Sequence, residues 1–394
     1  MAEFDRLTNQ TKYKEVLKQF FKFAESVHSN FLSNPYALTV SSGLLLTDLD
    51  SKSLYCGLNY GYAAAQAYTV YPDTDFLNLA VTLWTSVRKY MISDEKAASG
   101  TTEVKNFNLS SSCLGVTLEG GTFLTSDSND PILTSLASGF VFFLFYHYLM
   151  ANSENSASFF VSALLAEATS NQTYLDAAIK LANFIQMHLL DSSNIIAMSS
   201  QLNESCSVDL TACPYNSGIF IEGLVVLADI THNASTKALL SSTISNVTTY
   251  PQWQGLDGVI TTETTGGLYI VWALAALYEC NMTSSDLREY IKEYIAYFTL
   301  VQYNAVINQT TSGGSNIYGL PWTGAQSTLF SSAGQTVAIS SLLSAIQLAD
   351  DQPSSTLSDD PTSSGIPTGA IVGGVIGGLV VFTGIIVGIV LLRR

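Results

Sequence analysis

Apolar residues recur at helical spacing along most of the chain. Segments 13–27, 175–189 and 287–301 place their apolar residues three or four positions apart, so that each helix has one apolar face. Each segment follows a polar cluster of the kind that caps a helix, and a similar cluster at 72–75 precedes another apolar run. These segments are predicted to be amphipathic helices that bury one face.

A second kind of helix is poor in charge and rich in small residues, as in segments 61–67, 217–228 and 267–277. Alternation of outer amphipathic and inner small-residue helices predicts an all-α fold of hairpins closed into a ring, an (α/α)6 barrel over residues 1–350. A solenoid of two-helix repeats has the same local pattern. Two short runs, 115–118 and 259–261, have strand character and are expected to lie in loops.

The C-terminal part of the chain differs in composition from the rest. Residues 369–392 carry no charge, and at about 1.5 Å of helical rise per residue they can cross a hydrocarbon core of about 30 Å. We predict a transmembrane helix followed by a cytoplasmic end, residues 393–394, which holds two arginines. Glycines at four-residue spacing would allow transmembrane-helix pairing, although glycine is also simply common in membrane helices. Residues 351–368, rich in Ser, Thr and Pro, are predicted to form an exposed stalk.

Sequons and cysteines favour an extracellular or lumenal domain. The predicted N-glycosylation sites are Asn9, Asn108, Asn171, Asn203, Asn233, Asn246, Asn281 and Asn308. Cys206 and Cys213 enclose a short polar stretch and are predicted to form a disulfide. The first residues show no signal segment. Either such a segment is missing upstream or the chain is tail-anchored with a cytosolic domain, and the sequons and stalk favour the first.

The charge of the chain argues against several classes of function. A net charge of −16 argues against a nucleic-acid partner, because the chain has no basic stripe to neutralise phosphates. Only 12% of the residues are charged and 47% are hydrophobic, which predicts a large core behind a neutral polar surface. The four histidines are scattered and no cysteine pair has zinc-ligand spacing, so neither a metal nor a cofactor is expected.

Several segments resemble fungal glycoside hydrolase family 76. The resemblance covers about residues 50–345, and its most specific part is the Tyr-Asn-x-Gly element at 215–218. The other matching segments are 173–178, 182–184, 222–224 and 120–123, with Cys113 and Cys206. The resemblance implies an (α/α)6 barrel that acts on α-1,6-linked mannan-type polysaccharide of the cell wall. It also implies a substrate-binding cleft at one rim, lined by Tyr215, Asn216, Gly120 and Gly121.

The family's pair of adjacent catalytic aspartates is not matched in this chain. The corresponding positions hold Tyr55 and Cys56, and neither is a carboxylate. A retaining glycosidase needs two carboxyl groups about 5–5.5 Å apart. The catalytic candidates are therefore Asp48 and Asp50, which are otherwise loop aspartates, and Glu222. A carboxylate at 222 in an apolar helix costs free energy unless it is paired, so a structural hydrogen bond to a neighbouring loop is the alternative.

Three functional hypotheses follow from these observations. The first is a membrane-anchored glycoside hydrolase or transglycosylase that cleaves or remodels wall mannan. The second is a catalytically inactive wall-glycan-binding protein, and the third is an α-helical surface receptor outside the family. Residues 141–157 are additional to the family pattern, and we expect them to be either a lid over the cleft or an artefact of the gene model.

Overall fold

Two compact units make up the computed structural model. The hairpin unit comprises Ala2 and Thr11–Val247, and the C-terminal unit comprises Met1, Glu3–Gln10 and Thr248–Arg394. The described residues are 1–27, 54–110, 112–113, 115–134, 154–201, 208–212, 214–260, 267–279, 299–308, 317–318, 322 and 332–350. The predicted stalk and membrane segment lie outside them. Within these ranges, no helix combines the length and the apolar character that a bilayer span requires.

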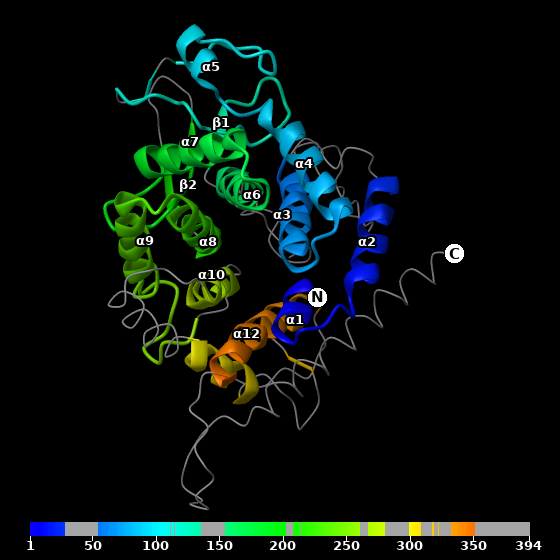
Figure 1. Ribbon diagram of the computed structural model, residues 1–394. Coiled ribbons are helices and arrows are strands. Elements are labelled where there is room, and N and C mark those ends of the chain that lie inside the picture. The colour runs from blue at the N-terminus through cyan, green and yellow to red at the C-terminus, as the bar shows by residue number, and fades with distance from the viewer. Residues whose placement is uncertain are drawn as a thin grey trace, which may run out of the picture. The chain divides into compact units, whose positions relative to one another are not determined.

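Helical hairpins form most of the hairpin unit (Figure 1). Its helices are α2 (Lys14–Val27), α3 (Tyr55–Val70), α4 (Thr74–Arg88), α5 (Asp94–Ser99), α6 (Glu154–Thr169), α7 (Gln172–His188), α8 (Pro214–Thr231) and α9 (Ala234–Val247). Helix α3 packs against α4, α6 against α7 and α8 against α9, while α6 also contacts both α3 and α8. Helices α3, α6 and α8 therefore form an inner layer, and each has an outer partner.

Burial separates the inner helices from the outer ones, as the sequence predicts. In α8, every residue from Pro214 to Ala228 is buried. In α7, Ala178, Leu181 and Ile185 are buried, while Ile179 on another face is 37% exposed. The predicted capping is also confirmed, because the Asn171 side chain accepts a hydrogen bond from the Thr173 backbone N–H at the start of α7.

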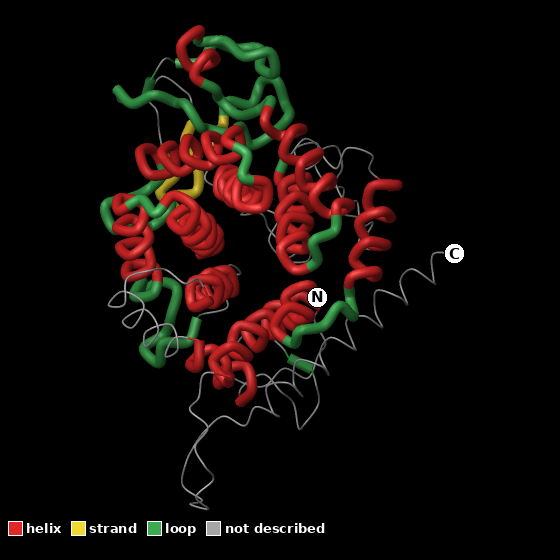
Figure 2. The backbone as a smooth tube through the Cα atoms, in the orientation of Figure 1, coloured by secondary structure: helices red, strands yellow, loops and turns green. Residues whose placement is uncertain are grey.

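A small antiparallel sheet adds to the hairpin unit (Figure 2). Its strands are β1 (Ile132–Thr134), β2 (Ala197–Gln201) and β3 (Val208–Ala212), in the order β1-β2-β3. Leu133 pairs with Ser200, and Ser199 pairs with Asp209. The sequence pattern does not predict this sheet, because the strands are short and β2 is mostly polar. The two runs with predicted strand character form only isolated bridges, Cys113 with Val116 and Gln254 with Ile260.

The C-terminal unit contains α1 (Ala2–Leu7), α10 (Gly267–Glu279), α12 (Ser332–Asp350) and a helical segment at 299–308. Helices α10 and α12 pack together. Buried Gln302 holds the loop at 258–260, because its Oε1 accepts from the Ile260 N–H at 2.9 Å and its Nε2 donates to the Gly258 carbonyl at 2.8 Å. The predicted amphipathic segment 287–301 lies mostly outside the described residues.

Candidate functional site

A buried carboxylate links two inner helices of the hairpin unit. Glu222, in the middle of α8, is only 6% exposed. The Tyr62 hydroxyl of α3 donates to Glu222 Oε2 at 3.1 Å, and the Gln66 Nε2 donates to Oε1 at 2.7 Å. An ionised carboxylate only accepts hydrogen bonds, and here each oxygen receives at least one. Both of these donors lie on a helix, so they are not the loop partner that the sequence leads us to expect, and a hydrogen bond between Glu222 and a loop stays a prediction.

Aromatic residues of α6 fix this arrangement from the side. The Tyr62 ring lies 4.9 Å from the Phe160 ring, centroid to centroid. Next to the carboxylate, a Cβ at Gly223 would come within 2.5 Å of the Phe159 ring. Glycine at 223 therefore allows α8 to approach α6 closely, and this contact holds the neighbouring Glu222 in place.

Tyr215 and Asn216 occupy the first turn of α8 and are both buried, at 8% and 0% exposure. Pro214 begins the helix, where a missing backbone N–H costs nothing. Glu222 follows Tyr215 by seven residues, which is two helical turns and about 10 Å of rise, so the two residues share one face of α8. The sequence-predicted binding residue and the buried carboxylate are thus aligned along a single helix.

The positions of the missing aspartate pair fall at the start of α3. This helix begins at Tyr55, and Cys56 is its second residue. Position 55 precedes Tyr62 by two turns, so the helical backbone places it on the face of α3 that carries the donor to Glu222. Asp48 and Asp50, the alternative candidates, lie outside the described residues, and their proposed role stays a prediction.

Gly120 and Gly121 form a turn that packs against α7. Gly120 has φ +88°, and a Cβ there would lie 2.3 Å from the Lys180 carbonyl oxygen. A Cβ at Gly121 would lie 2.8 Å from the Phe184 ring and 2.9 Å from Leu133. Glycine is therefore required for close packing at this turn. The predicted role of the two glycines in substrate binding remains a prediction.

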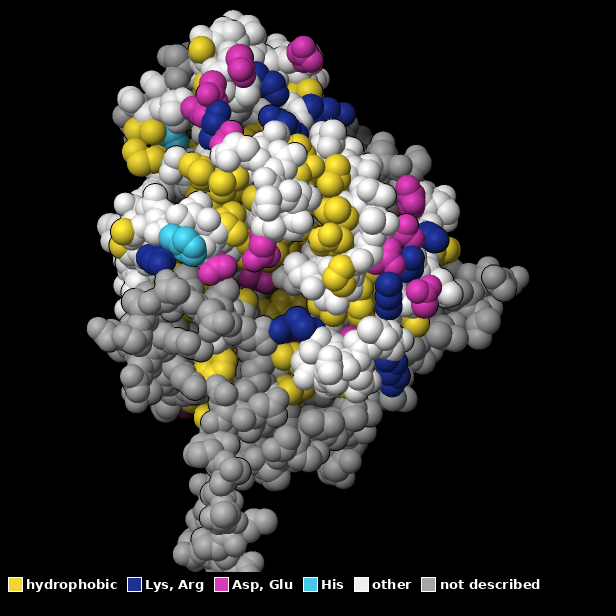
Figure 3. Space-filling model, in the orientation of Figure 1, with side chains coloured by type: hydrophobic (Ala, Val, Ile, Leu, Met, Phe, Trp, Pro, Cys, Tyr) yellow, Lys and Arg dark blue, Asp and Glu magenta, His cyan; other side chains and the backbone are white. Residues whose placement is uncertain are grey.

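A charged cluster surrounds this turn on the surface. Lys180 of α7 forms ion pairs with Asp94 of α5 and, at 2.7 Å, with Glu119. Burial raises the pKa of the Glu119 carboxyl, and its hydrogen bond with Asp94 adds to the effect. That same hydrogen bond, followed by the one from Lys180, lowers the pKa of Asp94. Figure 3 shows acidic and basic side chains side by side over α5 and the adjoining helices.

The structure describes some of the cysteines and sequons and leaves others outside the described residues. Cys113 is disulfide-bonded, while the predicted pair Cys206 and Cys213 lies outside the described residues. The predicted glycosylation sites Asn9, Asn108, Asn171, Asn233 and Asn308 are exposed, and Asn246 is half-buried. Asn203 and Asn281 are not among the described residues. In the part of the chain that is described, no group of three or more His, Cys, Asp or Glu side chains could bind a metal ion.

The match to known families decides the classification. The model of glycosyl hydrolase family 76 matches residues 145–358, which is more than half of the chain. The chain belongs to glycosyl hydrolase family 76. Its mostly helical structure has the α/α-barrel type of fold found in that family. No curated protein matches the sequence.

Solved structures share this fold at low sequence identity. The α-1,6-mannanase of Salegentibacter sp. HEL1_6 is 15% identical with a TM-score of 0.62, and the alignment covers 88% of each chain. An inactive variant of that enzyme, with two neighbouring aspartates replaced by alanine, was solved with α-1,6-mannotetrose. Dfg5 of Chaetomium thermophilum, solved with glucosamine, is 14% identical with a TM-score of 0.60, and the alignment covers 89% of this chain and 79% of Dfg5.

Proposed function

We propose that this protein acts on α-1,6-linked mannan-type polysaccharide of a fungal cell wall, which it cleaves or remodels. The observation that carries the proposal is the family 76 match over residues 145–358. An α-1,6-mannanase with the same fold supports the choice of substrate. The proposed fold is the (α/α)6 barrel that the sequence predicts, with a glycan cleft at one rim.

Within that barrel, the proposed glycan site is the facing surface of α3 and α8. Tyr215 and Asn216 at the start of α8, together with the Gly120–Gly121 turn, would contact the sugar. Glu222 would hold the two helices in register through Tyr62 and Gln66, because its carboxylate oxygens accept from both residues of α3. Any cleavage would depend on Asp48 and Asp50 or on Glu222, the carboxylates available to replace the missing pair.

A second candidate function is glycan binding without cleavage. The observation that favours it is that Tyr55 and Cys56 occupy the start of α3, where the family places two aspartates. General acid catalysis typically contributes about 10²–10⁴-fold, and the nucleophile adds to this. A protein that lacks both groups would retain the old site as a binding surface.

Reducing ends released from α-1,6-mannan distinguish the two functions. Wild-type cleavage at an ordinary enzymatic rate supports the hydrolase and points to Asp48 and Asp50. Saturable binding without product supports the binding protein. If neither cleavage nor binding is detected, both candidate functions are excluded. In the second case, Tyr55→Asp combined with Cys56→Asp is expected to raise activity above background. Cys56→Ser is the control for loss of the thiol alone.

We further propose that residues 369–392 anchor the protein in a membrane with its domain outside the cell or in the lumen. Exposure of five predicted N-glycosylation sites supports this side of the membrane. In Asn171 and Asn233, the side-chain oxygen caps a helix, which leaves the amide nitrogen available for a glycan. Treatment of the protein from secreting cells with an N-glycosidase should increase its gel mobility, and an unchanged mobility would contradict the proposal.

A further inference from the structure

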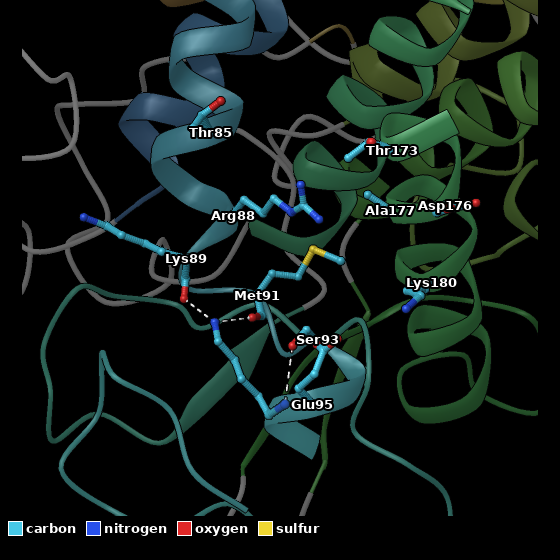
Figure 4. Close-up of a pocket in the computed structure, with 11 residues that line it drawn as sticks. Thr85, Arg88, Lys89, Met91, Ser93, Glu95, Thr173, Asp176, Ala177 and Lys180 are labelled. Atoms are coloured by element: carbon cyan, nitrogen blue, oxygen red, sulfur yellow. Dashed lines mark hydrogen bonds between the residues drawn. The ribbon is translucent and has the colours of Figure 1, made fainter. Parts of the chain in front are cut away.

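A cavity of about 540 Å³ opens between α4, α5 and α7 on the outer side of the hairpin unit (Figure 4). Small-molecule sites have volumes of about 300–1,000 Å³, so this cavity has room for a sugar-sized ligand. Its lining includes Arg88 of α4, Ser93 before α5, and Thr173 and Ala177 of α7. None of the α3 and α8 residues of the proposed mannan site contributes to it.

Basic residues outnumber acidic ones in the lining, although the whole chain carries a net charge of −16. The charged lining residues are Arg88, Lys89, Lys96, Lys180, Glu95 and Asp176. Basic residues in the lining of a cavity favour an anionic ligand only where they are not already neutralised by acidic partners.

Most of these charged groups already have partners. The Lys96 Nζ donates to the backbone carbonyls of Lys89 at 2.6 Å and of Met91 at 2.9 Å. Lys180 is ion-paired with Asp94 and Glu119. The Lys89 side chain points away from the cavity (Figure 4), with its Nζ 5.1 Å from the centroid of the Tyr90 ring. These three lysines therefore contribute positive charge near the cavity, but their ammonium groups are not available to donate hydrogen bonds to a ligand.

The two acidic residues of the lining are also engaged. Asp176 accepts a hydrogen bond from the Gln172 Nε2 at 2.7 Å. A hydrogen bond with the Ser93 hydroxyl lowers the pKa of Glu95, which keeps this carboxyl ionised. Both acids weaken the attraction for an anion, so a ligand needs a specific partner and not only the charge excess.

Arg88 is that partner. Its guanidinium lies over the Trp84 ring, with the Cζ 4.9 Å from the centroid. Figure 4 shows the side chain directed into the cavity toward Thr173 and Ala177. Across the described ranges of the chain, no side chain or carbonyl accepts a hydrogen bond from this guanidinium, and no carboxylate pairs with it. Stacking on the ring occupies only the flat face of the guanidinium, so its N–H fork remains available.

Trp84 holds Arg88 in this position. Its Nε1 donates to the Ser162 hydroxyl at 2.9 Å, and its ring lies 4.7 Å from the Tyr174 ring. The tryptophan itself is only 7% exposed. A guanidinium stacked on a fixed ring loses less side-chain entropy when it binds an oxyanion, because its orientation is already restricted.

We propose that this cavity binds an anionic sugar unit, with the Arg88 fork bound to its phosphate or carboxylate group. A guanidinium matches both groups with two parallel hydrogen bonds. The sugar ring would fill the space toward Ala177, where the Thr173 hydroxyl is available to its own hydroxyl groups. Binding here does not depend on the proposed mannan site, because the two sites share no residue.

Calorimetric titration of the full-length chain in mild detergent tests this site. The probes are mannose 6-phosphate and glucuronate, with neutral mannose and inorganic phosphate as controls. We expect at least one acidic sugar to bind saturably with a Kd below about 10 mM, and we expect no binding of mannose. The acidic sugar that binds more tightly identifies the phosphate or the carboxylate as the recognised group.

Two matched variants make the test specific to Arg88. Arg88→Gln is expected to weaken binding of the acidic sugar at least about tenfold, because the bidentate contact is lost. Lys89→Gln removes the same charge from the neighbouring residue, whose side chain points away, and is expected to change binding by less than about threefold. Arg88→Lys, which keeps the charge without the fork, should lie between them.

Several results would overturn the proposal. These are the absence of saturable binding of both acidic sugars, equal losses in Arg88→Gln and Lys89→Gln, or inorganic phosphate binding as tightly as mannose 6-phosphate. Binding of neutral α-1,6-mannan, measured in the same samples, reports on the proposed function separately. Failure at either site therefore does not imply failure at the other.

Discussion

Two glutamates of the hairpin unit carry the same charge in opposite surroundings. Glu222 is 6% exposed between inner helices and accepts hydrogen bonds from the neutral side chains of Tyr62 and Gln66. The Glu119 side chain is 26% exposed on the surface, where its partners are the charged groups of Lys180 and Asp94. The first carboxylate is held by hydrogen bonds in a buried layer, and the second by ionic contacts that solvent screens.

This difference determines what each region can do. Neutral donors around a buried carboxylate fix the spacing of α3 and α8 with little dependence on salt, which suits a site that must keep its geometry. Ionic partners at the surface respond to pH and salt, and they contribute little to stability one by one. We therefore expect the surface region to depend on backbone packing more than on its charges.

Gly120→Ala tests the backbone packing of the surface region and should have the largest effect. We expect a loss of about 4 kcal/mol in the free energy of unfolding, from the unfavourable φ and from the clash with the Lys180 carbonyl. The control is Gly115→Ala, since Gly115 has φ +82° but no atom within 4 Å of the place that a Cβ would occupy. It should cost only about 1–2 kcal/mol in denaturant titrations. Equal losses would show that the close approach to α7 is unimportant.

Glu222→Ala tests the buried region and should cost about 3 kcal/mol. The loss arises because the buried Tyr62 hydroxyl and the half-buried Gln66 amide would both lose the carboxylate that accepts from them. Urea titration followed by circular dichroism measures the change. Glu25→Ala on α2 is the control; its side chain is exposed, so we expect less than about 0.5 kcal/mol. A small loss for Glu222→Ala would mean that the carboxylate does not hold α3 and α8 together.

Lys180→Met tests the ionic contacts and should cost only about 1 kcal/mol at pH 7. Asp94 has a lowered pKa, so its contribution to stability is present above its ordinary value and is lost as the pH falls. Glu119 has a raised pKa, so its contribution to stability has the opposite pH dependence: it is present at low pH and is lost as the pH rises. The penalty of Lys180→Met should therefore shrink as the pH falls from 7 to below the ordinary aspartate pKa of about 3.9, because Asp94 becomes protonated only there. A penalty that does not change with pH would indicate lost packing instead of lost charge.

How far the sequence predicts the structure depends on the range of the interactions. The Asn171 cap and the one-sided burial of α7 follow from residues within a few positions, so the pattern predicts them. The partners of Glu222 lie 160 and 156 positions away on α3, and no local pattern identifies them. The free guanidinium of Arg88 depends on Trp84, which its own helix supplies, and on α5 and α7, which only the fold brings near.

Titration of α-1,6-mannan oligosaccharides into the full-length chain tests the central claim that the α3–α8 surface of this family 76 protein is its glycan site. We predict saturable binding by the wild type and a loss of at least about tenfold in both Tyr215→Ala and Glu222→Gln. Arg88→Gln, which changes the separate cavity, should bind the neutral oligosaccharide as the wild type does. Absence of wild-type binding, or unchanged affinity in both Tyr215→Ala and Glu222→Gln, would contradict the claim.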